Sequence, residues 1–481
     1  MQLSELALGY TMIGCDATVI GLCHESSRVK QGDLYFALQG GKYDGHDFVQ
    51  SAIKNGAIAV VVQRQLQDCS VSQIIVDDSR TAMSKIANVF FGNASQLLKI
   101  VGITGTNGKT TVSHIVASIL QSNGNSVAII GTLGIIVNGK FWDSTKSHNL
   151  TTPDPIYLHK VFKSLVEIGV EYVVMEVSAH ALFLNKLEGI KFECSVLTCF
   201  SRDHLDFFGT MQQYKLAKLK LFDPKFSKTA VVNIDDDLGM EIALQSNLPI
   251  ISYGCNRPSD VFGIHHKMNA RGLEYILNCV DNIVDINFKL PGLFNMYNTM
   301  AAASCAYVLG VPIKKIAIGI SNTTRVDGRF NIINTDRFSV VIDYAHTDDG
   351  LSNLLSTVRQ FAKGRIVTVF GCGGNRDVTK RPLMGLASAK HSDYTIITSD
   401  NPRFEEPNSI ISQIEKGIIS YKGAKYECIP DRRQAIKRAL ELANQDDIVV
   451  IAGKGAETTQ EIAGEFLAHN DWLYVNECLY T

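Results

Sequence analysis

The segment LLKIVGITGTNGKTTVSHIVASILQSNG (Leu97–Gly124) joins a β-branched strand, a glycine-rich loop and an amphipathic helix in direct succession. A phosphate-binding loop requires that order, because the N–H groups of a glycine turn converge on phosphate oxygens at the positive end of a helix. Lys109 can reach the β- and γ-phosphates, and the Thr110 hydroxyl can ligate magnesium. The spacing is a variant, since Ile103 stands where the first glycine is usual and Gly105 follows it. The segment predicts a nucleotide-binding domain.

Apolar strand-like runs alternate with helical segments after this loop. The runs SVAIIGT, EYVVMEV, CSVLTCF and KTAVVNID come first, and FSVVIDYAH, RIVTVFG, DYTIITSD and DIVVIAGKG follow TTRVDGRF. The alternation predicts an α/β fold with doubly wound parallel sheets. We expect three domains: a small α/β domain at 1–98, a central P-loop-type ATPase domain with a parallel sheet at 99–325, and a Rossmann-like domain at 326–481.

Composition narrows the class of protein. A chain of 481 residues is too long for a single core, and 46% hydrophobic with 20% charged residues describes an ordinary globular protein. The formal net charge is −2 without a dense basic block, so we expect no nucleic-acid or membrane partner. The N-terminus lacks a secretory signal, and no run of about 18 apolar residues occurs. Eleven cysteines without a C-x-x-C pair argue against a zinc site or a disulfide framework. The sequence predicts a soluble cytoplasmic protein, and we expect a monomer.

A second motif, TSDNPRFEEP (398–407), follows the strand-like run YTIITSD. Proline fixes the turn, and Arg403 is presented just beyond it. An arginine offers a planar fork of donors that suits a carboxylate, so the turn could capture a small acidic ligand. A solvated loop with a chance arginine is the alternative from this stretch alone.

The loop TGTNGKTT resembles the one shared by Mur ligases and folylpolyglutamate synthetases. Eight further motifs occur in order: LTTPDP (150–155), MEVSAHAL (175–182), SRDHLDFFGTMQQYKLAK (201–218), FNMYN (294–298), DYAHT (343–347), FGCGGNRDVTKRPLMG (370–385), DNPR (400–403) and GKGAE (453–457). Together they resemble the diaminopimelate-adding branch of the Mur ligase family, over nearly the whole chain.

The resemblance implies a reaction. Such a ligase uses ATP to join meso-2,6-diaminopimelate to the D-glutamate of UDP-N-acetylmuramoyl-L-alanyl-D-glutamate through an acyl phosphate, in cytoplasmic peptidoglycan precursor synthesis. The alternatives are a lysine-adding relative, a folylpolyglutamate synthetase-like ligase and, from another class, a P-loop switch or transport ATPase.

The resemblance also implies the residues that handle ATP and magnesium. The implied catalytic residues are Lys109, Glu176, His204 and Lys218. Thr110, Glu176, His204 and Lys218 are the implied ligands of two magnesium ions, with Lys218 carboxylated on its side-chain nitrogen; helical spacing alone indicates an exposed base there. The nucleotide is expected at Gly105, Thr106, Asn107, Gly108, Lys109, Thr110, Thr111, Asn295, Asn298, Arg329, Asp343 and His346. Asn295 and Asn298, three apart, are predicted to share one helical face.

A further set is implied for the two other substrates. The UDP-sugar peptide is expected at Ser27, Gly41, Lys42, Tyr43, Thr151, Thr152, Ser178 and Lys186. The added amino acid is expected at Arg376, Asp400, Asn401, Pro402, Arg403, Gly453 and Glu457. Diaminopimelate has a second carboxylate that lysine lacks, and Arg403 can pair with it, helped by Asn401 and Arg376. Glu457 and the Gly453 carbonyl could hold the distal ammonium.

The sequence departs from the family pattern at several positions. Leu184 and Lys186 stand where glutamine and arginine are usual, and Ala456 stands where histidine is common. Lysine lacks the bidentate fork of arginine, so contacts with the D-glutamate or the diphosphate are expected to differ. None of these changes removes a phosphate- or magnesium-binding group.

Overall fold

A computed structural model of the chain describes residues 1–41, 43–142 and 150–480. The described residues form two compact units of interleaved segments. The first unit comprises Met1–Gly102, Asn125–Ser195 and Ala217–Lys228, and the second comprises Ile103–Gly124, Val196–Leu216 and Thr229–Thr481. The chain passes from one unit to the other inside β6 (Lys99–Thr104), β11 (Cys194–Leu197) and α8 (Met211–Leu219).

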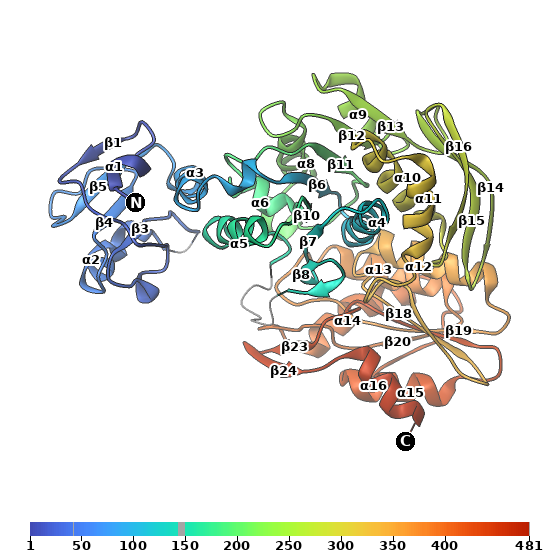
Figure 1. Cartoon of the computed structure of the whole chain (residues 1–481). Coiled ribbons are helices and arrows are strands. Elements are labelled where there is room, and N and C mark those ends of the chain that lie inside the picture. The colour runs from blue at the N-terminus through green and yellow to red at the C-terminus, as the bar shows by residue number, and fades with distance from the viewer. Residues whose placement is uncertain (42, 143–149, 481) are drawn as a thin grey trace. The chain divides into compact units, whose positions relative to one another are not determined.

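A five-stranded sheet of order β1-β5-β4-β3-β2 forms the N-terminal part of the first unit, with β1 antiparallel to β5 and the other neighbours parallel. Alternate residues face opposite cores: Leu34 and Phe36 pack with residues of α1 and α3, whereas Tyr35 packs with residues of α2. Figure 1 labels α1 and α2 beside this sheet. The elements are α1 (Leu3–Leu6), β1 (Thr11–Ile13), β2 (Gly21–Cys23), η1 (Ser26–Arg28), β3 (Asp33–Phe36), η2 (Gly45–Phe48), α2 (Val49–Lys54), β4 (Ala59–Val62), β5 (Ser72–Ile75), α3 (Ser79–Phe90) and η3 (Ala94–Gln96).

The rest of the first unit holds a parallel strand pair and a short antiparallel extension. Strand β10 runs parallel to β7, and β7, β8 and β9 follow one another as antiparallel neighbours. Strand β10 is buried along its whole length, up to Glu176 at its end. The elements are β7 (Val127–Gly131), β8 (Gly134–Val137), β9 (Lys140–Phe141), α5 (Pro155–Glu167), β10 (Tyr172–Glu176), α6 (Ala179–Phe183) and η4 (Lys220–Phe222).

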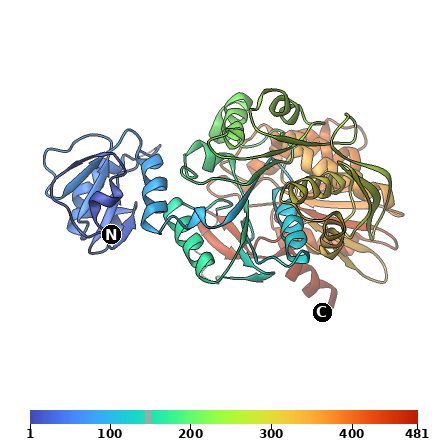
Figure 2. The same ribbon diagram turned by 45° about the horizontal axis from the view of Figure 1, so that its top comes forward.

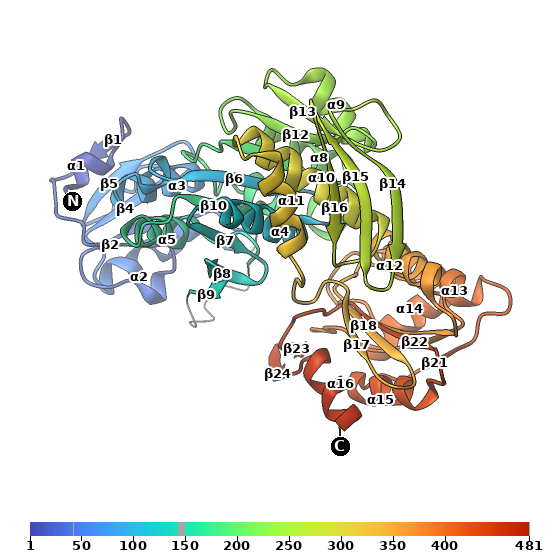
Figure 3. The ribbon, with the colours of Figure 1, turned by 45° about the vertical axis from the view of Figure 1, so that its right-hand side comes forward.

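In the second unit, α4 packs against α10 and α11, and Figure 2 shows the three helices side by side. Strands β12 and β13 are parallel, as predicted, and β14, β15 and β16 add an antiparallel meander (Figure 3) that the sequence analysis did not predict. An antiparallel sheet can leave one face in water, and residues of β16 alternate between exposed and at least half-buried. The elements are α4 (Lys109–Ser122), α7 (Leu205–Phe208), β12 (Ala230–Asn233), α9 (Asp237–Gln245), β13 (Ile250–Tyr253), β14 (Val261–Asn269), β15 (Gly272–Cys279), β16 (Asn282–Phe288), α10 (Leu293–Val308) and α11 (Ile313–Asn322).

A six-stranded sheet of order β17-β18-β22-β19-β20-β21 completes the second unit; β17 is antiparallel to β18, and the other neighbours are parallel. Helices α12, α13 and α14 cover one face, and α15 and α16 cover the other. The elements are β17 (Asn331–Asn334), β18 (Ser339–Asp343), α12 (Asp348–Phe361), β19 (Ile366–Phe370), α13 (Lys380–His391), β20 (Tyr394–Ile397), α14 (Pro407–Ile419), β21 (Tyr426–Cys428), α15 (Arg432–Leu442), β22 (Ile448–Ala452), β23 (Thr459–Ile462), β24 (Glu465–Ala468) and α16 (Asp471–Tyr480).

The four central strands of this sheet place their motifs at one edge. Strands β18, β19, β20 and β22 are parallel neighbours, so the loops that follow them meet at their carboxyl ends. Those loops carry DYAHT, GCGGNRD, SDNPR and GKGAE. Within the described ranges, no helix is long and apolar enough to span a membrane.

Candidate active site

The glycine-rich loop lies between β6 and α4, as the sequence predicts. Gly108 caps the N-terminus of α4 with a positive φ of 87°, and a Cβ atom there would lie 2.6 Å from the Asn298 side-chain oxygen. Glycine is therefore required at this position. The Lys109 ammonium donates to the carbonyl oxygens of Gly105 and Thr106, both at 2.9 Å. The loop thus holds its lysine over the turn that opens the helix.

The loop is fastened to the segment that carries the SRDHLD motif. The Thr106 hydroxyl donates to the Ser201 carbonyl at 3.0 Å, and the Ser201 N–H donates back to that hydroxyl at 3.0 Å. The Tyr214 hydroxyl lies 3.2 Å from the same oxygen, and burial raises the pKa of Tyr214. The phosphate loop and the His204 segment therefore form one local structure.

Residues of the DYAHT and GRF motifs reach the same loop. The Asn107 amide donates to Thr347 Oγ1 at 3.5 Å, and Arg329 donates to Thr110 Oγ1 at 3.1 Å. Asp343 accepts two backbone N–H groups at 2.7 Å, and its burial raises its pKa despite the nearby charge of Arg329. Arg329 thus contacts the phosphate loop directly, and the DYAHT motif contacts it through Thr347.

Asn295 and Asn298 share one face of α10, as their spacing predicts. Both side chains are buried, and Asn298 donates to the Asn295 side-chain oxygen at 3.0 Å. Asn295 donates to the Pro291 carbonyl at 2.7 Å. Because Asn298 also approaches Gly108, the pair lies beside the phosphate loop.

A buried acid that the sequence analysis did not single out lies next to His204. Asp203 is 3.4 Å from His204 Nε2, 3.6 Å from His346 Nε2 and 3.5 Å from Lys380 Nζ. Burial by itself would raise the pKa of Asp203, but the hydrogen bond from His346 and the charge of Lys380 outweigh it and hold that pKa well below its usual range. The acid directly before the histidine in SRDHLD was the available sequence signal.

Glu176 and Lys218 belong to the first unit. The Glu176 carboxylate is buried and accepts from the Thr132 N–H at 3.0 Å and from the Thr132 hydroxyl at 2.9 Å. Lys218 has only 1% of its surface exposed, so the interpretation of its spacing as an exposed base is wrong. Helix α8 is only weakly amphipathic, so the spacing of its apolar residues does not indicate which face of the helix is buried.

The residues predicted for the UDP-sugar peptide lie in the first unit as well. Thr152 Oγ1 donates to the Glu176 carbonyl at 2.9 Å and accepts from the Ser178 N–H at 2.9 Å. The Lys186 ammonium is 2.6 Å from Asp154. The Thr151 hydroxyl lies 3.2 Å from the hydroxyl of Thr132, the residue that also donates to Glu176.

The uridine-binding residues predicted in the N-terminal part are at the surface. Ser27 lies on the short helix η1, and both Ser27 and Gly41 are exposed. The Tyr43 ring is exposed and approaches the Phe48 ring edge-on. Lys42 lies outside the described residues.

The turn at DNPR packs against the glycine loop that follows β19. Arg403 Nη1 donates to the Gly374 carbonyl at 2.8 Å, and Arg403 Nε is 3.0 Å from a carboxylate oxygen of Glu461. Arg376, on the same glycine loop, lies 3.4 Å from Asp206. Both predicted arginines therefore already face an acid of the protein.

Asn401 connects the turn to the GKGAE loop. Its amide nitrogen donates to Glu457 at 3.0 Å, and its oxygen accepts from the buried Lys454 ammonium at 2.9 Å. Lys454 is also 2.7 Å from Glu457. The sequence analysis did not predict roles for Lys454 and Glu461. The available signal for Lys454 was a charged residue directly after the apolar run DIVVIAG.

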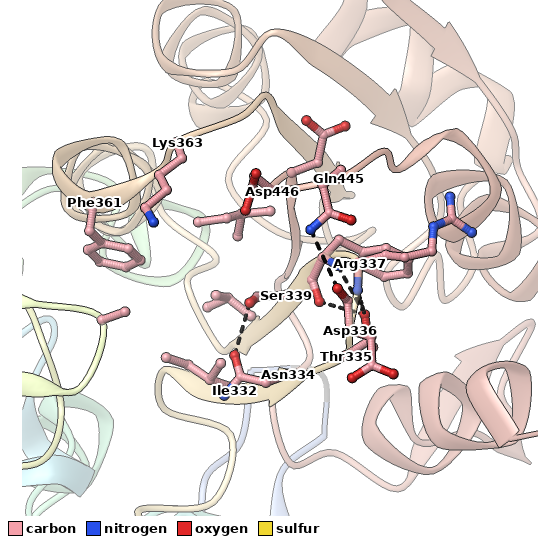
Figure 4. Close-up of a pocket in the computed structure, with 15 residues that line it drawn as sticks. Ile332, Asn334, Thr335, Asp336, Arg337, Ser339, Phe361, Lys363, Gln445 and Asp446 are labelled. Carbon is pink, nitrogen blue, oxygen red and sulfur yellow. Dashed lines mark hydrogen bonds between the residues drawn. The ribbon is translucent and has the colours of Figure 1, made fainter.

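A separate cavity of about 210 Å³ lies near the start of β18 and β22 (Figure 4). It is lined in part by Asn334, Arg337 and Gln445, and Gln445 donates to the Asp336 carbonyl at 3.4 Å. The predicted site residues do not line it, because they follow the carboxyl ends of these strands and the cavity lies at the opposite ends.

Three family profiles match the chain. The Mur ligase middle domain matches residues 103–306, and the glutamate ligase domain of Mur ligases matches residues 328–455. The catalytic domain of the Mur ligase family matches residues 18–91.

Similar proteins extend over nearly the full chain. A UDP-N-acetylmuramoyl-L-alanyl-D-glutamate–2,6-diaminopimelate ligase from Caldanaerobacter subterraneus subsp. tengcongensis is 40% identical over 463 residues, covering 96% of this chain and 95% of that protein. A solved structure of a ligase with the same name has a TM-score of 0.68 at 32% identity and covers 97% of both chains. A MurF ligase from Thermotoga maritima in complex with ADP has a TM-score of 0.65 at 19% identity, covering 96% of this chain and 97% of its own, which shows a shared fold.

Proposed function

The chain belongs to the Mur ligase family, and from this membership we propose that it joins meso-2,6-diaminopimelate to UDP-N-acetylmuramoyl-L-alanyl-D-glutamate at the expense of ATP. Two of the relatives described above are named as UDP-N-acetylmuramoyl-L-alanyl-D-glutamate–2,6-diaminopimelate ligases. The observation that carries the choice of amino acid is Arg403, whose guanidinium is held against Gly374 at the carboxyl edge of the C-terminal sheet. A fixed guanidinium there suits the second carboxylate of diaminopimelate, which lysine lacks.

We propose that each of three domains binds one of the three substrates. Residues 1–98 bind the UDP-sugar, 99–325 bind ATP, and 326–481 bind the amino acid. The three family matches support these ranges, because each match falls inside one of them.

The reaction needs an activated carboxylate. Transfer of the γ-phosphoryl group of ATP to the D-glutamate side-chain carboxylate gives an acyl phosphate and ADP. The amine of the amino acid then attacks the acyl carbon, phosphate leaves, and an amide forms. Lys109 and Arg329 supply positive charge for the phosphoryl oxygens, since both lie on or against the phosphate loop. The residues Gly105 to Thr111, Asn295, Asn298, Asp343 and His346 complete the proposed nucleotide site.

The residues proposed to hold magnesium fit a divalent cation chemically. Thr110 offers a hydroxyl oxygen and Glu176 a buried carboxylate, which are the oxygen ligands that magnesium prefers, whereas His204 offers an imidazole nitrogen, which suits magnesium less well. The Glu176 carboxylate accepts two hydrogen bonds from Thr132, and a metal ion would add a positive charge beside it. Magnesium, when bound, would offset the negative charge of the phosphate oxygens.

Lys218 is proposed to act as a carbamate. Its side chain is buried, and the proposed modification adds carbon dioxide to the side-chain nitrogen. Carboxylation converts the side chain into an anion whose oxygens can ligate a second magnesium ion. Carboxylated Lys218 would thus join the metal ligands named above.

The remaining substrate contacts are proposed by position. The UDP-sugar peptide is assigned to Ser27, Gly41, Lys42, Tyr43, Thr151, Thr152, Ser178 and Lys186, and the amino acid to Arg376, Asp400, Asn401, Pro402, Arg403, Gly453 and Glu457. We also propose that the protein works as a monomer in the cytoplasm, without nucleic-acid or membrane partners.

The test is an amino-acid panel with UDP-N-acetylmuramoyl-L-alanyl-D-glutamate and ATP, followed by phosphate release and product mass. We expect turnover with meso-diaminopimelate to exceed turnover with L-lysine by at least about 100-fold, because lysine offers no carboxylate to the N–H donors of Arg403 that the protein does not use. Arg403→Ala should lose this preference and keep ATP affinity, while Arg271→Ala, at the exposed β14–β15 turn, should behave like wild type. Equal use of lysine would identify a lysine-adding enzyme. Phosphate release without an amine would identify an ATPase of another class.

A further inference from the structure

The hairpin of β23 and β24 is joined to the DNPR turn through its backbone. The Arg403 N–H donates to the Glu461 carbonyl at 3.1 Å, and the Ala463 N–H donates to the Arg403 carbonyl at 2.6 Å. The Glu461 N–H donates to the Asn401 side-chain oxygen at 3.0 Å, and the Gln460 amide donates to the Asp400 carbonyl at 2.7 Å. Figure 1 shows this hairpin as the red strands beside the C-terminal sheet. The hairpin is therefore hydrogen-bonded to Asp400, Asn401 and Arg403, and in the described part of the chain Pro402 is the one residue of the turn without such a bond.

Arg403 has a backbone conformation that few side chains adopt. Its φ is 52°, in the left-handed region, which is unfavourable for an arginine. The two hydrogen bonds to the hairpin hold it there. Such strain persists where the surroundings over-determine it, and it aims the side chain in one direction.

The guanidinium is fixed at two of its edges. Glu461 takes the Nε–H at 3.0 Å, and the Gly374 carbonyl takes an Nη1–H at 2.8 Å. A guanidinium has five N–H donors, so three donors can still serve a ligand. The Arg403 and Glu461 side chains are each 21% exposed, which leaves the pair open to a substrate on one side.

We propose that Glu461 is a positioning residue for the selection of the added diamino acid, acting through Arg403. It fixes the guanidinium plane before the substrate arrives, so that the remaining donors meet the second carboxylate. An arginine that is free to rotate would lose side-chain entropy on binding, and a fixed one does not. This inference rests on the proposed function, because only a diamino acid with a second carboxylate would use the fixed donors.

Glu461 also carries a negative charge that would act against binding of a substrate carboxylate, and the experiment separates this repulsion from the positioning of Arg403. Glu461 is an anion close to the place where the substrate carboxylate would bind, so it could weaken binding by repulsion. Removing its charge while keeping its acceptor separates the two effects. Glu461→Gln keeps an oxygen for Arg403 Nε, and Glu461→Ala removes both charge and acceptor.

The measurement is KM and kcat for meso-diaminopimelate and for L-lysine at saturating ATP and UDP-sugar dipeptide. Glu461→Ala is expected to raise KM for diaminopimelate about 10-fold, to leave kcat within about 2-fold, and to leave kcat/KM for lysine within about 2-fold. Glu461→Gln should stay within about 3-fold of wild type. Glu465→Ala, an exposed glutamate on the same hairpin, is the matched control and should have no effect.

Two results would overturn the inference. One is an unchanged ratio of kcat/KM between the two amino acids in Glu461→Ala, and the other is a lower KM for diaminopimelate in that variant. A merely structural role would change both amino acids alike, and a thermal unfolding curve for each variant checks the fold. Failure of the proposed function gives a different pattern, because the wild type itself would then show no preference for diaminopimelate.

Discussion

Replacing Arg432 by methionine tests the ion pair between Arg432 and Asp471. This pair connects the DNPR loop with the GKGAE loop in the proposed amino-acid site. The Arg432 guanidinium and the Asp471 carboxylate are fully buried and share two hydrogen bonds of 2.9 and 2.7 Å. Arg432 also donates to the Ala452 carbonyl at 3.0 Å and to the Ser399 carbonyl at 3.4 Å. Ser399 and Ala452 directly precede the two loops, so one guanidinium fixes the spacing between them.

The expected loss of stability follows from the buried Asp471 carboxylate, which would keep His469, 2.7 Å away, as a partner but lose both hydrogen bonds from the guanidinium. Burial by itself would raise the pKa of Asp471, but the charge of Arg432 outweighs it and holds that pKa well below its usual range. The carboxylate of Asp471 is therefore ionised at neutral pH in the intact pair. Removing one partner of a buried pair costs about 3–5 kcal/mol, against about 5–15 kcal/mol for the stability of a whole domain. The stabilisation by the pair is present above the unfolded pKa of about 4 and is lost as the pH falls below it.

Urea unfolding followed by tryptophan fluorescence measures this loss locally. Trp472 adjoins Asp471, and the sequence has one other tryptophan, so a Trp142→Phe background isolates the signal. We expect Arg432→Met to lower the free energy of unfolding by about 3–5 kcal/mol and Arg433→Met, at an exposed neighbour, by less than about 0.5 kcal/mol. A loss below about 1 kcal/mol in Arg432→Met, or an equal loss in the control, would refute the reasoning.

Three further outcomes follow from single residues. Burial lowers the pKa of His159 to about 3, so between pH 6.5 and 3 the His159 imidazole takes up a proton only in the unfolded chain. The free energy of unfolding should therefore fall by about 2 kcal/mol from pH 7 to pH 5. Urea titrations of His159→Leu should show a smaller fall over the same range. A Cβ atom at Gly374 would lie 1.9 Å from the Pro402 carbonyl oxygen, so Gly374→Ala should raise KM for the amino acid at least about 10-fold while KM for ATP, measured alongside, stays constant. Lys218→Ala should lose at least about 99% of its activity and recover part of it with added short carboxylates, and full activity in that variant would discard the carbamate.

The central strands of the fold were predictable because they are buried on both faces. Parallel strands covered by helices on each side are continuous apolar runs, and IVVIA of β22 and YVVME of β10 are buried at every residue. The phosphate loop was predictable for a different reason, since a strand, a glycine turn and a helix leave a local pattern. Both predictions needed only information from neighbouring residues.

The missed parts depend on contacts between distant residues. Strands β23 and β24 have only four residues each. Strand β23 is half-buried and β24 is exposed although it contains Phe466 and Leu467, so neither shows an alternation that predicts a strand. Glu461 contacts Arg403 from 58 residues away, and Lys380 reaches Asp203 from a different motif. The burial of Lys218 was likewise invisible, because it follows from packing around α8 and not from the sequence of the helix.

The missed residues explain how this edge of the second unit can gather so many cations. Arg403 faces Glu461, Lys454 faces Glu457, and Lys380 faces Asp203, so each positive group meets an acid of the chain. Cations gathered at one edge of a sheet would repel one another without such partners. The pairing also keeps the local field small, so a weak general attraction for anions cannot select the substrate. Selection by charge then depends on direction: a ligand carboxylate gains only where the guanidinium still presents unused donors, and the hairpin determines where those donors point.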